Sequence, residues 1–165
     1  MKWISHKITT GAVVFALSGD PAGALISAAA STFPDFVEGK DYESPRWRKN
    51  HRKVSHWWVA YCAASAVFFF WTYLHYGKVP PLFQALSRRD VFVFVPVCMY
   101  LFLGSTLHVL EDALCGKVPL LNPLRRTFGL LLFRVGSAAE YGFVCAIVGI
   151  SMFVTRIFRI GGIWY

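Results

Sequence analysis

The sequence predicts an all-α fold: a small polytopic membrane helical bundle in one domain, residues 1–165, with a short N-terminal helical hairpin and three full transmembrane helices. Apolar residues make up 56% of the chain and charged residues only 16%, which differs from the balance of a soluble domain. Several apolar runs approach the roughly 20 residues that a helix needs to cross a bilayer. The net charge of +8 therefore indicates basic loops and attraction to anionic headgroups, with no nucleic-acid partner.

The first apolar segment, residues 8–33, is interrupted by Gly-Asp-Pro at 19–21. One span would carry this charged, helix-breaking triplet at mid-membrane, whereas two short helices over 8–18 and 22–33 would turn there. Each would be only about 17 Å long and would need cover from neighbours. Basic residues flank the segment on both sides, and the positive-inside rule favours bringing its ends together as a hairpin. The triplet would also break a signal peptide, so we expect the segment to be retained.

Three longer apolar runs follow, at about 56–76, 91–112 and 136–158, and each is long enough to span a bilayer as a helix. The first begins with Trp57 and Trp58 and ends in further aromatic residues, the belt typical of a membrane–water interface. The stretch between the last two runs contains a glycine and two prolines that exclude a long helix. These runs are the three expected transmembrane helices.

The hairpin arrangement places the N-terminus and the segments 34–55 and 113–134 on one side of the membrane. Twelve of the seventeen Lys and Arg residues lie there, so we expect this side to face the cytoplasm of a bacterial inner membrane. The same side receives the ionisable side chains of a candidate site: His6, Asp35, His51, His56, His108, Asp112 and Glu140. Ionisable residues at the ends of membrane helices are costly unless they pair or bind an ion.

His108 and Asp112 form the strongest pair in this set. They are four residues apart at the end of an apolar run, so both point from one face of a helix, an arrangement used in metal ligation. Glu111 points about 100° away around the helix and is left out of the predicted ligands. The alternative for the pair is a helix-end histidine bonded to its own carboxylate.

Six residues are candidate metal ligands: His6, Asp35, His51, His56, His108 and Asp112. Histidine and carboxylate ligands without paired cysteines favour Zn²⁺, with Mn²⁺ or Fe²⁺ as alternatives, and their number leaves room for two ions. The four cysteines show no CxxC spacing, and Cys115 is either a turn residue or a further ligand. A metal with an open position would activate water against an ester or phosphoester. Glu140 is the candidate base or, alternatively, orients a ligand, and Arg52 is the candidate holder of an anionic group.

Three strings carry a family resemblance: His-Arg-Lys-Val-Ser-His at 51–56, Leu-His-Val-Leu-Glu-Asp at 107–112 and Val-Pro-Leu-Leu-Asn-Pro at 118–123. They resemble the bacterial inner-membrane family of metal-dependent hydrolases of the YdjM type. The likeness extends in order to His6, to Pro34-Asp35 and to the segment 136–140. It implies a His/Asp metal site and a hydrolase similar to zinc-dependent phospholipases.

The chain departs from the family pattern at two positions. Ser55 stands where the family usually has Thr, and Val37 stands where many members have a second Asp. The first change keeps a hydroxyl group. The second removes a carboxylate, so the resemblance does not imply a complete site for two ions.

We expect a membrane-bound, metal-dependent hydrolase that acts on a lipid-linked or phosphoester substrate at the cytoplasmic interface. One alternative is a non-catalytic subunit, part of an oligomer or larger membrane assembly, whose polar cluster binds a structural metal or orders the helix ends. Another is an anchor that binds anionic lipid through its basic loop alone. Closure of the site by four or more protein ligands favours a structural metal, and an open position favours catalysis.

Overall fold

The computed structural model describes residues 1–39, 51–87 and 91–161 of the chain. Their regular secondary structure is helical, and the only bridge of β type among them joins Val118 to Phe128. The elements in order are α1 (Trp3–Ser18), α2 (Pro21–Ala30), α3 (Phe33–Glu38), the 3-10 turn η1 (Val54–His56), α5 (Trp58–Tyr76), α6 (Leu82–Ser87), the 3-10 turn η2 (Val91–Val93), α7 (Phe94–Cys115) and α8 (Ala138–Ile160). The all-α prediction is confirmed.

The chain turns back between α1 and α2, so the structure has the hairpin and not the single span. Gly19 ends α1 in the left-handed conformation, with φ of 65°. Asp20 then caps α2 by accepting a hydrogen bond of 3.0 Å from the backbone of Ala22, and Pro21 occupies the first helical position, where its missing N–H costs nothing. The other oxygen of Asp20 accepts a 2.8 Å bond from the backbone of Leu82, which ties the turn to α6.

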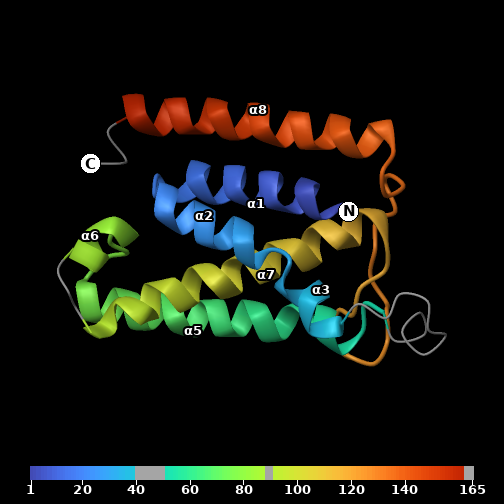
Figure 1. Ribbon diagram of the computed structural model, residues 1–165, viewed down its shortest axis with the longest axis horizontal. Coiled ribbons are helices and arrows are strands. Elements are labelled where there is room, and N and C mark those ends of the chain that lie inside the picture. The colour runs from blue at the N-terminus through green and yellow to red at the C-terminus, as the bar shows by residue number, and fades with distance from the viewer. Residues whose placement is uncertain (40–50, 88–90, 162–165) are drawn as a thin grey trace.

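The helices stack side by side, with α8 outermost, then the α1–α2 hairpin, then α7 and α5 (Figure 1). Small residues allow α2 and α7 to pack closely: a Cβ at Gly104 would clash with the carbonyl oxygen of Ser27, and one at Gly23 would clash with the ring of Tyr100. The hydroxyl of Ser27 also donates a 2.8 Å bond to the carbonyl of Tyr100. This packing fixes α7, which carries two of the site residues, against the hairpin.

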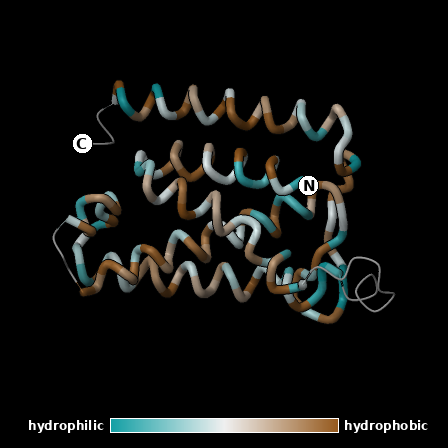
Figure 2. The backbone as a smooth tube through the Cα atoms, in the orientation of Figure 1, coloured by the Kyte–Doolittle hydropathy of each residue, from teal (hydrophilic) through white to brown (hydrophobic). Residues whose placement is uncertain are grey.

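One end of the bundle gathers the N-terminus, α3 and the connection between α7 and α8, while α6 lies at the other end (Figure 1). The long helices are largely hydrophobic along their middle sections, and hydrophilic residues collect near α3 and the N-terminus (Figure 2). The side chains expected on one face of the membrane are therefore close together in space.

Within the described residues, two helices are long and apolar enough to cross a membrane: Val91–Cys115 and Ala138–Ile160, each with a mean hydropathy of 1.9. The prediction of three full spans is therefore wrong in one element. Helix α5 has 19 residues, but its Trp, Tyr, Thr, Ser and His residues lower its hydropathy. It also begins at Trp58, because His56 belongs to the preceding 3-10 turn.

Candidate metal centre

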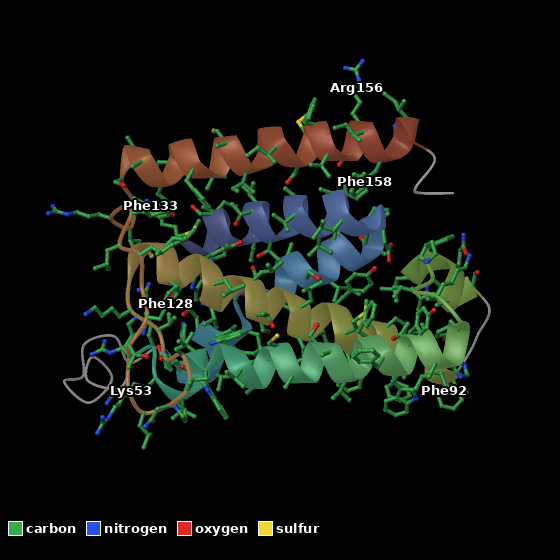
Figure 3. The ribbon with its side chains drawn as sticks, turned by 180° about the vertical axis from the view of Figure 1, so that it is seen from behind. Lys53, Phe92, Phe128, Phe133, Arg156 and Phe158 are labelled. Carbon is green, nitrogen blue, oxygen red and sulfur yellow. The ribbon has the colours of Figure 1, made fainter. Side chains whose placement is uncertain are left out.

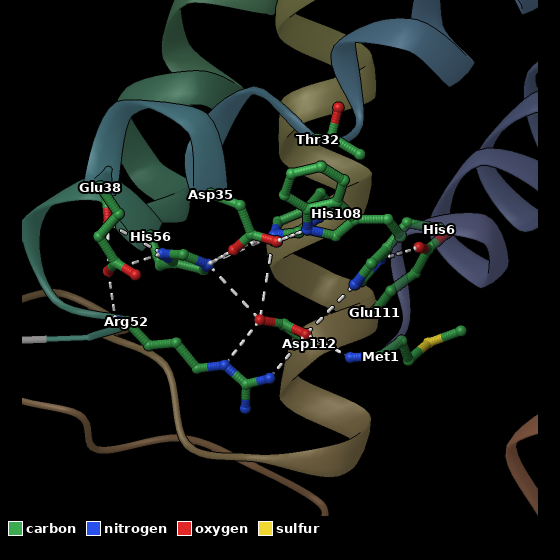
Figure 4. Close-up of polar contacts among 12 residues, drawn as sticks. Met1, His6, Thr32, Asp35, Glu38, Arg52, His56, His108, Glu111 and Asp112 are labelled. Carbon is green, nitrogen blue, oxygen red and sulfur yellow. Dashed lines mark hydrogen bonds and ion pairs between the residues drawn. The ribbon is translucent and has the colours of Figure 1, made fainter. Parts of the chain in front are cut away.

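Four side chains from three separate elements meet at one point: Asp35 of α3, His56 of η1, and His108 and Asp112 of α7 (Figure 4). Each offers one ligand atom, and these atoms all lie within 4.8 Å of one another. Asp35 is partly buried and the other three are buried. The described residues thus contain a compact set of two nitrogen and two oxygen ligands.

The spacing of these atoms fits one divalent ion. The Nε2 atoms of His56 and His108 are 3.2 Å apart. Asp35 Oδ1 lies 3.3 Å from the first and 3.5 Å from the second, and Asp112 Oδ2 lies 3.5 Å and 3.9 Å from them. Ligand atoms bound at about 2.0–2.2 Å in a tetrahedron would be about 3.3–3.6 Å apart. The donor set and its geometry suit zinc, and also manganese or iron.

The two residues of the pair predicted on α7 share a helix face without a hydrogen bond between them. His108 Nε2 and Asp112 Oδ2 are 3.9 Å apart, beyond hydrogen-bond distance. Both atoms instead face Asp35 and His56. The alternative of a histidine bonded to its own carboxylate therefore does not describe this pair.

Glu38 orients His56 from behind. The hydroxyl of Ser55 lies 2.9 Å from His56 Nδ1 and donates a 2.7 Å bond to Glu38. Glu38 also accepts a 2.6 Å bond from the backbone of Arg52 and pairs with the ring of His51. Outer partners of this kind set which ring nitrogen faces a metal. His51, predicted as a ligand, thus contacts Glu38 and lies outside the four-residue set.

Glu111 orients the ring of His6, as Glu38 orients that of His56. Its carboxylate lies 2.6 Å from His6 Nδ1 and accepts bonds of 2.6 Å and 3.1 Å from Thr9 and Thr10. The opposite ring nitrogen, His6 Nε2, is buried, makes no hydrogen bond and lies 3.3 Å from Asp112 Oδ1. His6 therefore approaches the site from the other side of Asp112, outside the four-residue set.

Arg52 covers the same carboxylate. Its Nε lies 2.7 Å from Asp112 Oδ2 and its Nη2 lies 3.0 Å from Oδ1, a two-pronged contact that fixes the carboxylate. The amino group of Met1 lies 2.7 Å from Asp112 Oδ1 and 3.1 Å from Cys115 Sγ. Cys115 is thus near the site but does not belong to the four-residue set.

Glu140 lies elsewhere. It is fully buried and accepts bonds from the hydroxyl of Ser5 at 2.5 Å, the backbone of Lys2 at 2.8 Å and the backbone of Gly136 at 2.6 Å. These bonds join the start of α8 to the start of α1. The structure supports a positioning role, and the role of base stays a prediction.

The ionisable groups of Asp35, Glu38 and His56, outside the membrane helices, shift one another's pKa values. Burial opposes ionisation of Asp35 and Glu38, but hydrogen bonds from histidines outweigh it and hold the pKa of each carboxyl well below its usual range. Burial likewise disfavours a charged His56, but Asp112, Asp35 and Glu38 together raise its pKa to about 10. The imidazole of His56 therefore carries a proton that a metal ion would have to displace.

A pocket of about 330 Å³ opens onto this cluster. Asp35, Arg52 and Asp112 line it together with Trp3 and Val135. It therefore gives a small molecule access to two of the four ligand residues and to the guanidinium group.

The family model described as YdjM inner membrane protein matches residues 1–162. The chain belongs to this family. No curated protein and no solved structure matches it. Membership in the YdjM family confirms the resemblance found in the sequence, and together with the two apolar helices it supports a location in the membrane.

Two of the residues that support the site, Glu38 and Glu111, were not predicted. Glu38 lies in the sequence among loop residues with no helical period, and Glu111 lies off the face of His108 and Asp112. A buried carboxylate at the end of an apolar run is a usable signal for Glu111. Its partners, however, come from α1, and only the folded chain brings them together.

Proposed function

We propose that this YdjM-family protein is a membrane-bound, metal-dependent hydrolase that acts on phosphoester or lipid-linked substrates. The observation that supports it best is the set of four ligand atoms with the spacing of a zinc site. The adjoining pocket, with Arg52 in its wall, is the second support. Zinc is the preferred ion, and manganese and iron suit the same donors.

Asp35, His56, His108 and Asp112 would hold the ion. A bound divalent ion supplies a water molecule of lowered pKa and polarises the phosphoryl oxygen. Hydrolysis joins the water oxygen to phosphorus and breaks the phosphorus–oxygen bond to the leaving alcohol. One proton of the water ends on that alcohol, and the other stays with the oxygen that is now bound to phosphorus. Arg52 would hold an anionic substrate in place. Glu38 would orient the ring of His56 through Ser55.

His6 extends the proposed site. Its Nε2 lies 3.3 Å from Asp112 Oδ1, whereas the Nε2 atoms of His56 and His108 lie 3.5 Å and 3.9 Å from Oδ2. Asp112 thus has a histidine nitrogen near each of its oxygens, and an ion held by His6 would replace the amino group of Met1 and the guanidinium group of Arg52 at Oδ1. His6 is therefore proposed as the ligand of a second ion, and a metal stoichiometry above one per chain would support that assignment.

We infer that the site faces the cytoplasm. Eight of the eleven Lys and Arg residues that the structure describes lie near the N-terminus and in the segments 51–55 and 116–137, on the side of the metal centre, and the positive-inside rule favours the cytoplasm for such segments. The basic segment at 40–50, proposed to attract anionic headgroups, lies outside the described residues.

A structural metal in a non-catalytic membrane subunit is the second candidate. It is favoured by the number of ligands, because four protein ligands can close a tetrahedral site. The pocket beside Asp112 favours catalysis instead, because a catalytic zinc expands its coordination where a cavity admits water or substrate.

Metal analysis and hydrolysis, measured on the same detergent-purified full-length protein, distinguish these functions. We expect at least one zinc ion per chain and cleavage of bis(p-nitrophenyl) phosphate, both lost in Asp112→Asn and His108→Ala. His75→Ala is the matched control, since this histidine lies at the far end of α5 against Phe92. Metal without hydrolysis would identify the structural role. Absence of bound metal, or equal loss in His75→Ala, would refute the proposal.

A further inference from the structure

The connection between α7 and α8, residues 116–137, combines exposed apolar and basic side chains. Eight of its large apolar residues are exposed, and so are its four basic residues, Lys117, Arg125, Arg126 and Arg134. Apolar groups that penetrate the acyl boundary, with basic groups that reach anionic headgroups, are typical of a surface at a membrane interface.

The position of this connection agrees with its composition. It joins the ends of the two helices that are able to cross a membrane, so it lies at the level where both leave the lipid. Figure 3 shows Phe128 and Phe133 of the connection at the same end of the bundle as Lys53, with Phe92 and Arg156 at the opposite end. Its exposed side chains therefore face the lipid interface on the side of the metal centre.

Part of the connection is held in place with its side chains outward. We call Leu130, Leu131, Leu132 and Val135 the leucine strip. Backbone bonds of 2.7 Å and 2.6 Å join two of its members to the carbonyls of Ala113 and Leu114 at the end of α7. The exposed fractions of the four side chains are 55%, 58%, 62% and 52%.

The leucine strip leads into the pocket on the metal centre. Val135, its last member, lines that pocket together with Arg52 and Asp112. Trp3 also lines the pocket: it is 42% exposed, and its Nε1 donates a 2.7 Å bond to Asp35. The lining of the pocket therefore combines the guanidinium group of Arg52, which suits a phosphate group, with Val135 of the exposed leucine strip.

We propose that the leucine strip is the entrance for a membrane phospholipid, whose acyl chains stay in the lipid over the strip while its phosphodiester enters the pocket beside Arg52. This inference rests on the proposed hydrolase and specifies its substrate class. A water-soluble phosphodiester shares the same reacting group but gains nothing from the strip. The two sources of substrate are therefore separable by experiment.

The test uses full-length, zinc-loaded protein and two probes: vesicles of phosphatidylglycerol and phosphatidylethanolamine, and soluble bis(p-nitrophenyl) phosphate. The variant is Leu130→Ser/Leu132→Ser. The matched control is Phe83→Ser/Leu86→Ser, which removes two exposed apolar side chains from α6 at the other end of the bundle. We expect the strip variant to cleave vesicle lipid at least about tenfold more slowly, with soluble diester cleavage and metal content within twofold of wild type. Unchanged lipid cleavage, or equal loss with both probes, would overturn the proposal.

A readout without turnover separates this proposal from the hydrolase. A photo-crosslinking amino acid at position 132, in nanodiscs that contain phosphatidylglycerol, is expected to form a lipid adduct, and the same group at position 84, an exposed polar position of α6 at the other end of the bundle, is the control. Zinc-loaded wild type that cleaves neither probe would refute the hydrolase. Absence of an adduct at position 132, or equal adducts at both positions, would refute the entrance.

Discussion

Removal of Glu38 tests how the metal centre is held together. This carboxylate accepts hydrogen bonds from the backbone of Arg52 and the hydroxyl of Ser55, pairs with His51, and lies 3.5 Å from His56 Nδ1. None of its atoms belongs to the four-residue set. Its effect on a metal would therefore act through the orientation of His56.

The expected magnitude follows from that arrangement. Loss of an outer partner of a metal-binding histidine costs about 10- to 100-fold in affinity, which is about 1.4–2.7 kcal/mol. Glu38→Ala removes every acceptor and should reach this range. Glu38→Gln keeps one acceptor oxygen for Ser55 or Arg52 and loses the negative charge, so we expect a smaller loss, about three- to tenfold.

The assay is a zinc titration of detergent-purified protein against a chromophoric chelator at constant pH, with circular dichroism as the check on folding. Gln84→Ala is the matched control, because it removes an exposed polar side chain from α6 at the far end of the bundle. A folded Glu38→Ala protein that binds zinc within twofold of wild type would show that His56 needs no such support. Equal weakening in Gln84→Ala would point to a general loss of stability.

Three further predictions follow from the packing and the charges. Gly104→Ala should destabilise the protein by about 1–3 kcal/mol, because the new Cβ would clash with Ser27. Thermal unfolding in detergent measures the change, and an unchanged midpoint would contradict the close packing of α2 and α7. Glu140→Gln should lower the unfolding temperature but leave the zinc content intact, because the hydrogen bonds of Glu140 join α8 to α1. Loss of turnover at unchanged stability would instead support the role of base. Zinc affinity should rise by about tenfold per pH unit from about pH 6 to 8, because the ion displaces the proton that His56 keeps through its raised pKa. Zinc titrations that show no pH dependence would exclude that displacement.

Short-range patterns in the sequence predicted much of the fold. Gly-Asp-Pro at 19–21 indicated the turn of the hairpin, because its conformational preferences act within three residues. Charge distribution indicated which ends of the helices lie together. Hydropathy was less reliable for α5, since aromatic residues with polar groups suit a helix buried against neighbours as well as one in lipid.

In the candidate site, too, some features follow from the sequence alone and others only from the folded structure. By itself the sequence determined that His108 and Asp112 lie on one face of a helix, because residues four apart share a face whatever the rest of the chain does. Only the tertiary structure decided that Asp35 and His56 join them, that His51 contacts Glu38, and that Glu111 supports His6. Those contacts depend on where α1, α3 and η1 pack against α7, and long-range packing leaves no periodic trace in the sequence.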